Sequence, residues 1–211
     1  MTRVKICGLT RRRDVRLAVQ LGAWACGIVL TDGPRRVDLD DAARLVDAAG
    51  STLTVGVFTV EPAAAIAAAV RTAGVGAVQL TGGAEGPTVE EVRAAGRGHG
   101  RQPLVIAAVG TPDVADADFV LLDPRLPGAY GSTGHTRDWL ALADAGGFDP
   151  EMLILAGGLT PVNVGEAIAA LRPRVVDVAS GVEAATGKKD RDLLEAFFKA
   201  VTVADLPEAS L

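Results

Sequence analysis

A thiol and a carboxyl group each stand where an apolar run of the sequence ends. Cys7 follows residues 4–6 (VKI) and precedes a glycine, and Asp123 follows residues 119–122 (FVLL). A thiolate can act as a base, and a carboxyl group removed from water can hold a proton to donate. The pair predicts proton-transfer chemistry. The alternatives are a small apolar filler for the cysteine and a local backbone cap for the aspartate.

The first apolar run is expected to be a strand that presents Cys7 to an interior. Side chains alternate along a strand, so Lys5 and Cys7 share one face and the two apolar residues share the other. Thr10 is expected to cap a helix over residues 11–21, whose free N–H groups would favour a thiolate. The sequence therefore predicts a thiol at Cys7 that could act as a general base or as a nucleophile.

Candidate binding groups lie at the ends of other apolar runs. Arg35 and Arg36 follow residues 25–30, and planar guanidinium groups bind carboxylates or phosphates through two hydrogen bonds. The alternative for these arginines is a solvated pair. Gln79 is expected to face inward from residues 77–80. Arg35, Arg36 and Gln79 are therefore candidates for contact with a substrate.

Two small turns near the C-terminal end predict a phosphate site. Gly157 with Gly158, and Ser180 with Gly181, each follow a short apolar run. Glycine lets a ligand approach the backbone closely, and backbone N–H groups bind phosphate in this position of many α/β barrels. Either turn alone would be a weak signal, whereas the two together favour a phosphate monoester site.

Eight short apolar runs alternate with helical segments along the chain. The predicted strands are residues 3–7, 25–30, 53–58, 77–80, 104–109, 119–122, 152–155 and 175–178. The predicted helices are residues 11–21, 39–49, 62–72, 89–95, a short piece at 112–115, 138–145, 161–171 and 190–201. Strands of this kind indicate a parallel sheet covered by helices. The regular repeat favours a single (β/α)8 TIM barrel of the α/β class over an open doubly wound sheet.

Closure of the barrel would make its first and eighth strands neighbours. Lys5 and Asp177 both alternate inward, so we expect an interior ion pair between them. Asp177 is also predicted to contact the substrate. In this fold the active site lies at the C-terminal ends of the strands, where all the candidate residues are placed.

Composition sets limits on the class of protein. The chain has 211 residues, 49% of them hydrophobic, and a formal net charge of -5. We expect one barrel domain over residues 1–204 and a tail over residues 205–211. The negative charge predicts no nucleic-acid partner, and no apolar run approaches the roughly 18 residues needed to span a membrane.

The cysteines and the spacing of polar residues limit location and cofactors. Cys7 and Cys26 form no disulfide framework, and a strand from residue 3 leaves no room for a secretory signal, so a cytoplasmic location is expected. Neither His99 nor His135 belongs to a cluster with metal-ligand spacing. We expect no metal and no organic cofactor. The oligomeric state stays open between monomer and homodimer.

Several motifs in chain order resemble the phosphoribosylanthranilate isomerase family of tryptophan biosynthesis. They are residues 5–10 (KICGLT), 78–80 (VQL), 122–123 (LD), 138–139 (DW), 157–164 (GGLTPVNV), 176–183 (VDVASGVE) and 187–190 (GKKD). The resemblance covers nearly the whole chain. It implies a TIM barrel that converts a phosphorylated aminoaldose into an aminoketose by an Amadori rearrangement, without a cofactor.

The resemblance also implies roles for single residues. Cys7 would be the general base and Asp123 the general acid. Arg35 would bind the anthranilate carboxylate. The turns at Gly157-Gly158 and Ser180-Gly181 would bind the phosphate of a small phosphorylated sugar-amine substrate.

Departures from the family's usual pattern concern the aromatic end of the substrate. The family usually has other residues at six positions of this chain, namely Ile28, Leu30, Arg36, Thr81, Ser132 and Arg137. A paralogue that rearranges a different phosphoribosylated aromatic amine therefore stays open as the first alternative. A phosphate-binding barrel without catalysis is the second, although it would not need an acid and a base at one mouth.

Overall fold

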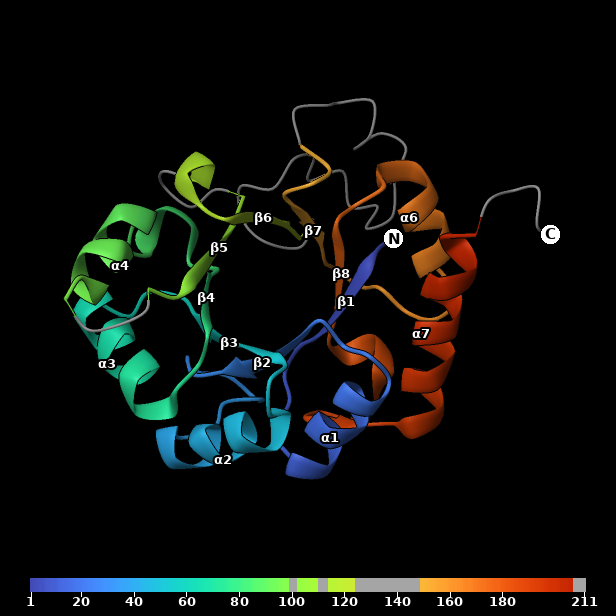
Figure 1. Cartoon of the computed structure of the whole chain (residues 1–211), viewed down its shortest axis with the longest axis horizontal. Helices are drawn as coiled ribbons and strands as arrows, with labels where there is room; N and C mark the ends of the chain where they lie inside the picture. The colour runs from blue at the N-terminus through green and yellow to red at the C-terminus, as the bar shows by residue number, and fades with distance from the viewer. Residues whose placement is uncertain (99–101, 110–113, 124–148, 207–211) are drawn as a thin grey trace.

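Eight parallel strands follow one another around a closed barrel, in the order of the chain (Figure 1). This computed structural model describes residues 1–98, 102–109, 114–123 and 149–206. The strands are β1 (Arg3–Ile6), β2 (Ala25–Val29), β3 (Leu53–Phe58), β4 (Ala77–Leu80), β5 (Leu104–Ala108), β6 (Phe119–Leu122), β7 (Leu153–Leu155) and β8 (Val175–Val178). The predicted barrel is confirmed, and β8 pairs with β1, which excludes the open sheet.

Helices surround the barrel in Figure 1 and cover the outer face of the strands. They are α1 (Arg12–Gln20), α2 (Leu39–Ala49), α3 (Ala63–Ala73), α4 (Val89–Gly96), α6 (Val164–Leu171) and α7 (Arg191–Ala204). Short 3-10 turns are η1 (Gly83–Glu85), η2 (Val114–Asp116) and η3 (Ser180–Val182). The predicted helix over 138–145, both histidines, Ser132 and Arg137 lie outside the described residues, as do positions 112 and 113 of the short predicted piece.

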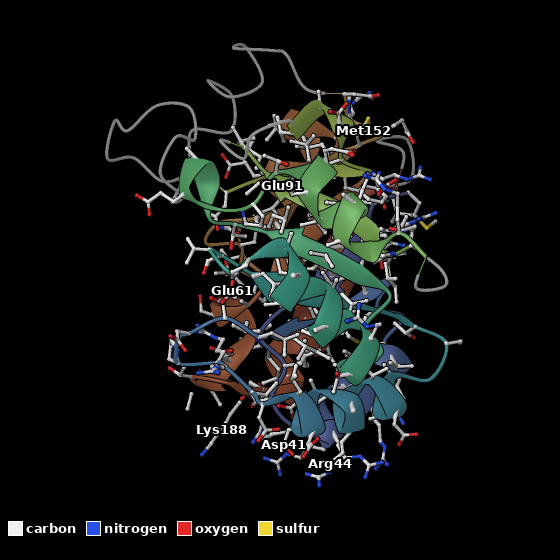
Figure 2. The ribbon with its side chains drawn as sticks, turned by 90° about the vertical axis from the view of Figure 1, so that its left-hand side faces the viewer. Asp41, Arg44, Glu61, Glu91, Met152 and Lys188 are labelled. Atoms are coloured by element: carbon white, nitrogen blue, oxygen red, sulfur yellow. The ribbon has the colours of Figure 1, made fainter. Side chains whose placement is uncertain are left out.

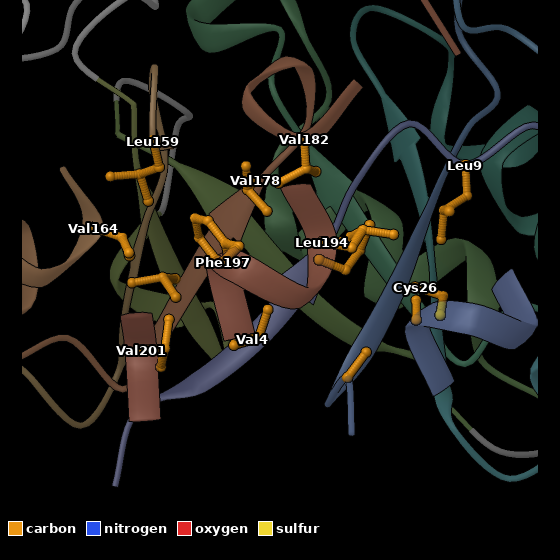
Figure 3. Close-up of a cluster of buried hydrophobic side chains, with 14 of the residues drawn as sticks. Val4, Leu9, Cys26, Leu159, Val164, Val178, Val182, Leu194, Phe197 and Val201 are labelled. Atoms are coloured by element: carbon orange, nitrogen blue, oxygen red, sulfur yellow. The ribbon is translucent and has the colours of Figure 1, made fainter. Parts of the chain in front are cut away.

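Alternation along each strand separates an interior core from an outer core. Small and branched side chains such as Ala25, Val55 and Ile106 fill the interior. On the outer side, Val4 and Val178 pack beneath α7, where Figure 3 shows Phe197 lying against the barrel wall. Burial of both faces explains why the strands read as near-continuous apolar runs.

Charged side chains cover the outer helices. Asp41 and Arg44 of α2 form an exposed ion pair, and Figure 2 shows both pointing away from the barrel. Thr88 and Glu91 form a reciprocal capping box at the start of α4, which satisfies two backbone N–H groups of the first turn. The helices thus present charged residues to solvent, while the apolar residues of the strands are buried.

The predicted cap of the first helix is wrong, and a hairpin that was not predicted explains why. The N-cap of α1 is Arg11, without a side-chain cap, whereas Thr10 Oγ1 donates to the carbonyl of Gly187. Gly187 lies in a small antiparallel hairpin, β9 (Glu183–Ala185) with β10 (Lys188–Lys189). The Thr10 hydroxyl therefore binds the carbonyl of Gly187 in the hairpin and does not cap α1.

Thr2 and Asp205, near the two ends of the described chain, are in contact at the end of the barrel where the strands begin. Thr2 donates to the carboxylate of Asp205 through both its backbone N–H and its hydroxyl. Asp205 directly follows the last residue of α7. No helix in the described part of the chain is long and apolar enough to cross a membrane.

Candidate active site

A pocket at the C-terminal ends of the strands gathers every predicted site residue except Arg35 and Arg36. It is lined by Cys7, Gln79, Asp123 and Asp177, and by the two turns Gly157-Gly158 and Ser180-Gly181. These residues lie in the C-terminal halves of β4 and β8 or follow β1, β6, β7 and β8. The barrel therefore brings the candidate acid and the candidate base to one mouth, as the alternation of the strands predicted.

An ion pair lies beneath this pocket. Lys5 and Asp177 are directly opposite each other on β1 and β8, and Lys5 Nζ lies 2.7 Å from Asp177 Oδ2. The lysine side chain is completely buried. The predicted interior pair is confirmed. Burial acts to lower the pKa of Lys5, but the Asp177 carboxylate, helped by Cys7, outweighs burial and raises that pKa.

The environment of Cys7 differs from the expected one. Burial raises the pKa of the Cys7 thiol, and the Lys5 ammonium group opposes this shift only in part. The predicted lowering is wrong because burial, the largest influence on this pKa, removes water from the thiol. Gly27 lies directly beside the thiol, since a Cβ there would stand 2.8 Å from Cys7 Sγ.

Two buried oxygens in the pocket have no hydrogen-bond partner among the described residues. They are Gln79 Oε1 and Asp177 Oδ1. Gln79 is 4% exposed and Asp177 is 7% exposed. A buried acceptor without a donor costs free energy, so native proteins keep few of them, and those at a pocket are available to a ligand.

The two glycine-containing turns pack against each other at one side of the pocket. Gly157 and Gly158 both have positive φ angles, 91° and 74°. A Cβ at Gly181 would stand 1.9 Å from the carbonyl oxygen of Leu159, so only glycine fits there. Asn163 holds the first turn, because its side chain accepts from Thr160 N and donates to Gly158 O. These contacts give the pocket a rigid wall of backbone.

Arg35 lies beside the pocket and is held by a carboxylate that was given no role from the sequence. Its Nε and Nη2 donate to the two oxygens of Glu183 at 2.9 Å and 2.6 Å. Its stem crosses the backbone at Gly8, where a Cβ would stand 2.4 Å from Arg35 Cδ. Arg36, in contrast, forms an exposed pair with Asp32. The two neighbouring arginines therefore differ, since only Arg35 is fixed.

Lys189 is the second partner of Glu183 that was missed. Its side chain is completely buried and donates to Glu183 Oε1 and to the carbonyl of Ala179. Burial lowers the pKa of Lys189, and the contact with Glu183 opposes this only in part. The sequence contains one signal for this contact: Glu183 and Lys189 lie on either side of Thr186-Gly187, which forms the turn of a hairpin.

A larger hollow of about 930 Å³ lies at the opposite end of the barrel, against about 160 Å³ for the mouth pocket. Four of the residues that line it contact one another, since Thr2 donates to Asp205 and the Arg3 guanidinium lies over the Trp24 ring. We place the candidate site in the smaller pocket, which holds the candidate acid Asp123, the Cys7 thiol and the two acceptors without a partner among the described residues. Among the described residues, no group of three His, Cys, Asp or Glu side chains is placed to hold a metal.

The closed parallel barrel with its polar pocket at the C-terminal ends of the strands is the arrangement of TIM-barrel enzymes. Comparison with known proteins narrows the class. The family model described as N-(5'phosphoribosyl)anthranilate (PRA) isomerase matches residues 4–200. The chain belongs to this family, as the motifs of the sequence predicted.

Relatives and solved structures agree with the family. N-(5'-phosphoribosyl)anthranilate isomerase of Acidithiobacillus ferrooxidans is 39% identical over 207 residues, covering 93% of this chain and 96% of the relative. The enzyme of Thermotoga maritima is also 39% identical, over 94% of this chain and 98% of its own. TrpF from Jonesia denitrificans superposes with a TM-score of 0.79 at 32% identity, covering 99% and 100% of the two chains.

A further solved structure contains a ligand. It is phosphoribosylanthranilate isomerase in complex with reduced 1-(o-carboxyphenylamino)-1-deoxyribulose 5-phosphate. It superposes with a TM-score of 0.74 at 34% identity, covering 96% of this chain and all of the other. The ligand of that protein carries a carboxylate at one end and a phosphate at the other.

Proposed function

We propose that the mouth pocket isomerises N-(5'-phosphoribosyl)anthranilate to 1-(2-carboxyphenylamino)-1-deoxyribulose 5-phosphate, a step of tryptophan biosynthesis. The observation that carries this proposal is the convergence of Cys7 and Asp123 in one pocket beside two glycine turns. An Amadori rearrangement needs one group that donates a proton and another that removes one. The family to which the chain belongs supports the same reaction.

Asp123 acts in the first step. Its carboxyl group protonates the ring oxygen of the furanose, and the bond between that oxygen and the first sugar carbon breaks. The nitrogen lone pair forms the C=N bond of a protonated Schiff base. Asp123 is left as a carboxylate, so the step conserves protons and charge.

Cys7 acts in the second step. Its thiolate removes the proton from the second sugar carbon, and the electron pair of that C–H bond neutralises the Schiff base to give an enolamine. The first carbon then takes up a proton from water and the hydroxyl group on the second carbon releases one to water, which gives the aminoketose. Exchange with water also returns Cys7 to the thiolate and Asp123 to the acid, so Asp123 supplies the first proton transfer and Cys7 the second.

The other residues bind and orient the substrate. Gln79 Oε1 and Asp177 Oδ1 accept hydrogen bonds from sugar hydroxyl groups, which fills their unused acceptor capacity. The turns at Gly157-Gly158 and Ser180-Gly181 bind the phosphate with backbone N–H groups. Arg35 binds the anthranilate carboxylate.

A continuous fluorescence assay with freshly made phosphoribosylanthranilate tests the reaction. We expect the folded protein to consume this substrate. Absence of turnover by a folded sample, with the enzyme of Thermotoga maritima as a positive control, would contradict the proposal.

One observation supports a second candidate, the same rearrangement on another phosphoribosylated aromatic amine. Thr81 lines the pocket, where the family resemblance predicts a histidine. Steady-state comparison of anthranilate with ring-substituted analogues separates the two candidates, since the better substrate has the higher kcat/KM. A preference for an analogue would select the second.

The cysteines bear on the location of the protein, and a relative bears on its assembly. We infer a cytoplasmic location from two free cysteines, Cys7 and Cys26, because such thiols persist in reducing compartments. For assembly we infer a monomer or a homodimer. A related isomerase from Thermotoga maritima is described as dimeric, and light scattering on the purified chain distinguishes the two states.

A further inference from the structure

Glu183 accepts hydrogen bonds from four donors. They are Arg35 Nε, Arg35 Nη2, Lys189 Nζ and the backbone N–H of Gly187, at 2.9, 2.6, 2.9 and 3.2 Å. The glutamate side chain is only 4% exposed. Burial acts to raise the pKa of Glu183, but the hydrogen bonds from Arg35 and Lys189 outweigh burial and lower it. The carboxylate is therefore ionised and shared between two cations.

We propose that Glu183 is a positioning residue that joins the two ends of the substrate site. It holds Arg35, which is proposed to bind the carboxylate of the substrate. Through Lys189 it also holds the carbonyl of Ala179, just before the Ser180-Gly181 turn that is proposed to bind the phosphate. This inference rests on the proposed function, because it assigns Glu183 a part in binding the same substrate. Glu183 acts through its neighbours and need not contact the substrate itself.

The geometry of Arg35 shows what Glu183 does at the carboxylate end. A guanidinium group has two edges that can bind a carboxylate through parallel hydrogen bonds, the Nε/Nη2 edge and the Nη1/Nη2 edge. Glu183 occupies the first edge, and Gly8 lies under the stem of the side chain. The orientation of the second edge is then fixed in advance, which reduces the entropy lost when a substrate carboxylate binds.

Lys189 connects Glu183 to the turn that is proposed to bind the substrate phosphate. Its ammonium group joins Glu183 Oε1 to the carbonyl of Ala179, the residue just before Ser180. A peptide whose carbonyl is fixed has its following N–H fixed as well, because the peptide unit is planar. The orientation of the Ser180 N–H, the first N–H of the second turn, thus depends on Glu183 through the Lys189 side chain.

The hairpin that carries both residues is anchored to the start of α1. Asp14 accepts from the backbone N–H of Lys189, and Arg11 donates to the Lys189 carbonyl. Thr10 donates to Gly187 O. The hairpin is therefore held by side chains of residues 10–14 that bind its backbone at Gly187 and Lys189, and the Glu183 side chain connects this hairpin to Arg35.

Glu183→Gln is the first test, because the amide keeps the shape and loses the charge and one acceptor oxygen. We expect KM for phosphoribosylanthranilate to rise about tenfold or more, the size of a lost charge-assisted hydrogen bond, while kcat falls less. The effect should be smaller with phosphoribosylaniline, which lacks the carboxylate. Glu195→Gln breaks an exposed pair with Arg191 and serves as the matched control without effect.

Inorganic phosphate provides a readout that does not depend on turnover. Calorimetry should show weaker phosphate binding to Glu183→Gln and to Lys189→Met than to the wild type. Unchanged phosphate affinity together with KM within twofold of the wild type would overturn the inference. If the wild type binds phosphate but shows no isomerase activity, the proposed function fails. The calorimetry with phosphate would still test the role of Glu183.

A double-mutant cycle tests the coupling without altering Glu183, in case its variant does not fold. Arg35→Lys and Lys189→Met are measured singly and together. Coupling through the shared carboxylate predicts that the combined loss in kcat/KM differs from the product of the single losses by at least about threefold. Independent losses, with each variant folded by circular dichroism, would overturn the inference.

Discussion

Two buried carboxylates at the barrel mouth, Asp177 and Glu183, have opposite hydrogen-bonding states. Asp177 Oδ2 accepts from Lys5, whereas its Oδ1 has no partner among the described residues. Glu183 accepts from four donors and lies between two cations. Both side chains are about equally buried, at 6% and 4% exposed.

The difference indicates what each carboxylate is for. A buried charge whose hydrogen bonds are complete can hold its neighbours in place, and it has little capacity left for a ligand. A buried oxygen left without a donor lowers stability until something binds it. We therefore assign Glu183 to the architecture of the site and Asp177 to the recognition of substrate hydroxyl groups.

Lys5→Met should cause the largest loss of stability, because it leaves the Asp177 carboxylate buried without a cation. We expect the free energy of unfolding to fall by about 3–5 kcal/mol, measured by urea denaturation. Lys5→Met combined with Asp177→Leu should recover much of this loss, since an apolar pair of similar volume needs no compensation. Stability equal to the wild type in Lys5→Met would mean that the pair contributes nothing.

The thiol of Cys7 should respond with opposite signs to the two partners of that pair. Lys5→Met removes the main charge that favours the thiolate, so the pKa of Cys7 should rise further. Asp177→Asn removes a negative charge that disfavours the thiolate, so the pKa of Cys7 should fall. Iodoacetamide alkylation rates as a function of pH report this pKa. Shifts of the same sign in both variants would argue against the electrostatic account.

The second cysteine provides the internal control for this titration. Cys26 is fully buried, and burial raises its pKa to about 12. It should not react over the accessible pH range, and a Cys26→Ala background should give the same curve. In activity, the limb of the wild-type pH profile of kcat/KM that reports the Cys7 thiol should be absent from Cys7→Ser.

Gln79→Met should have the smallest effect on stability, because it removes an acceptor that has no donor in the described structure. We expect the free energy of unfolding to stay within about 1 kcal/mol of the wild type while KM increases. Asn163→Leu is the contrasting variant, since both ends of the Asn163 amide are bonded. It should lose more stability than Gln79→Met, and the reverse order would contradict the comparison.

The sequence predicted the barrel well because each strand is buried on both faces. Apolar runs such as residues 53–58 and 175–178 were recognised with the bounds of β3 and β8. Strand alternation was enough to predict the Lys5–Asp177 pair once closure placed β1 beside β8. Errors of one to three residues occur at element ends, as at α6, which begins at Val164 rather than residue 161.

The parts that were missed depend on contacts between distant residues. Thr10 looked like a helix cap, but its hydroxyl binds Gly187, which lies 177 residues later. The hairpin over residues 183–189 (EAATGKK) has no apolar alternation to mark its strands. The raised pKa of Cys7 follows from how closely the barrel packs around the thiol, as at Gly27, and local sequence does not contain that information.

The most direct test of the account is the activity of Cys7→Ser with phosphoribosylanthranilate. Serine keeps the size of the side chain but scarcely ionises at neutral pH, so kcat should fall at least about a hundredfold, as expected for loss of a general base. Phosphate affinity and the circular dichroism spectrum should stay those of the wild type. Near-full activity in a folded Cys7→Ser protein would show that the thiol only fills space, and the assignment of the base would be wrong.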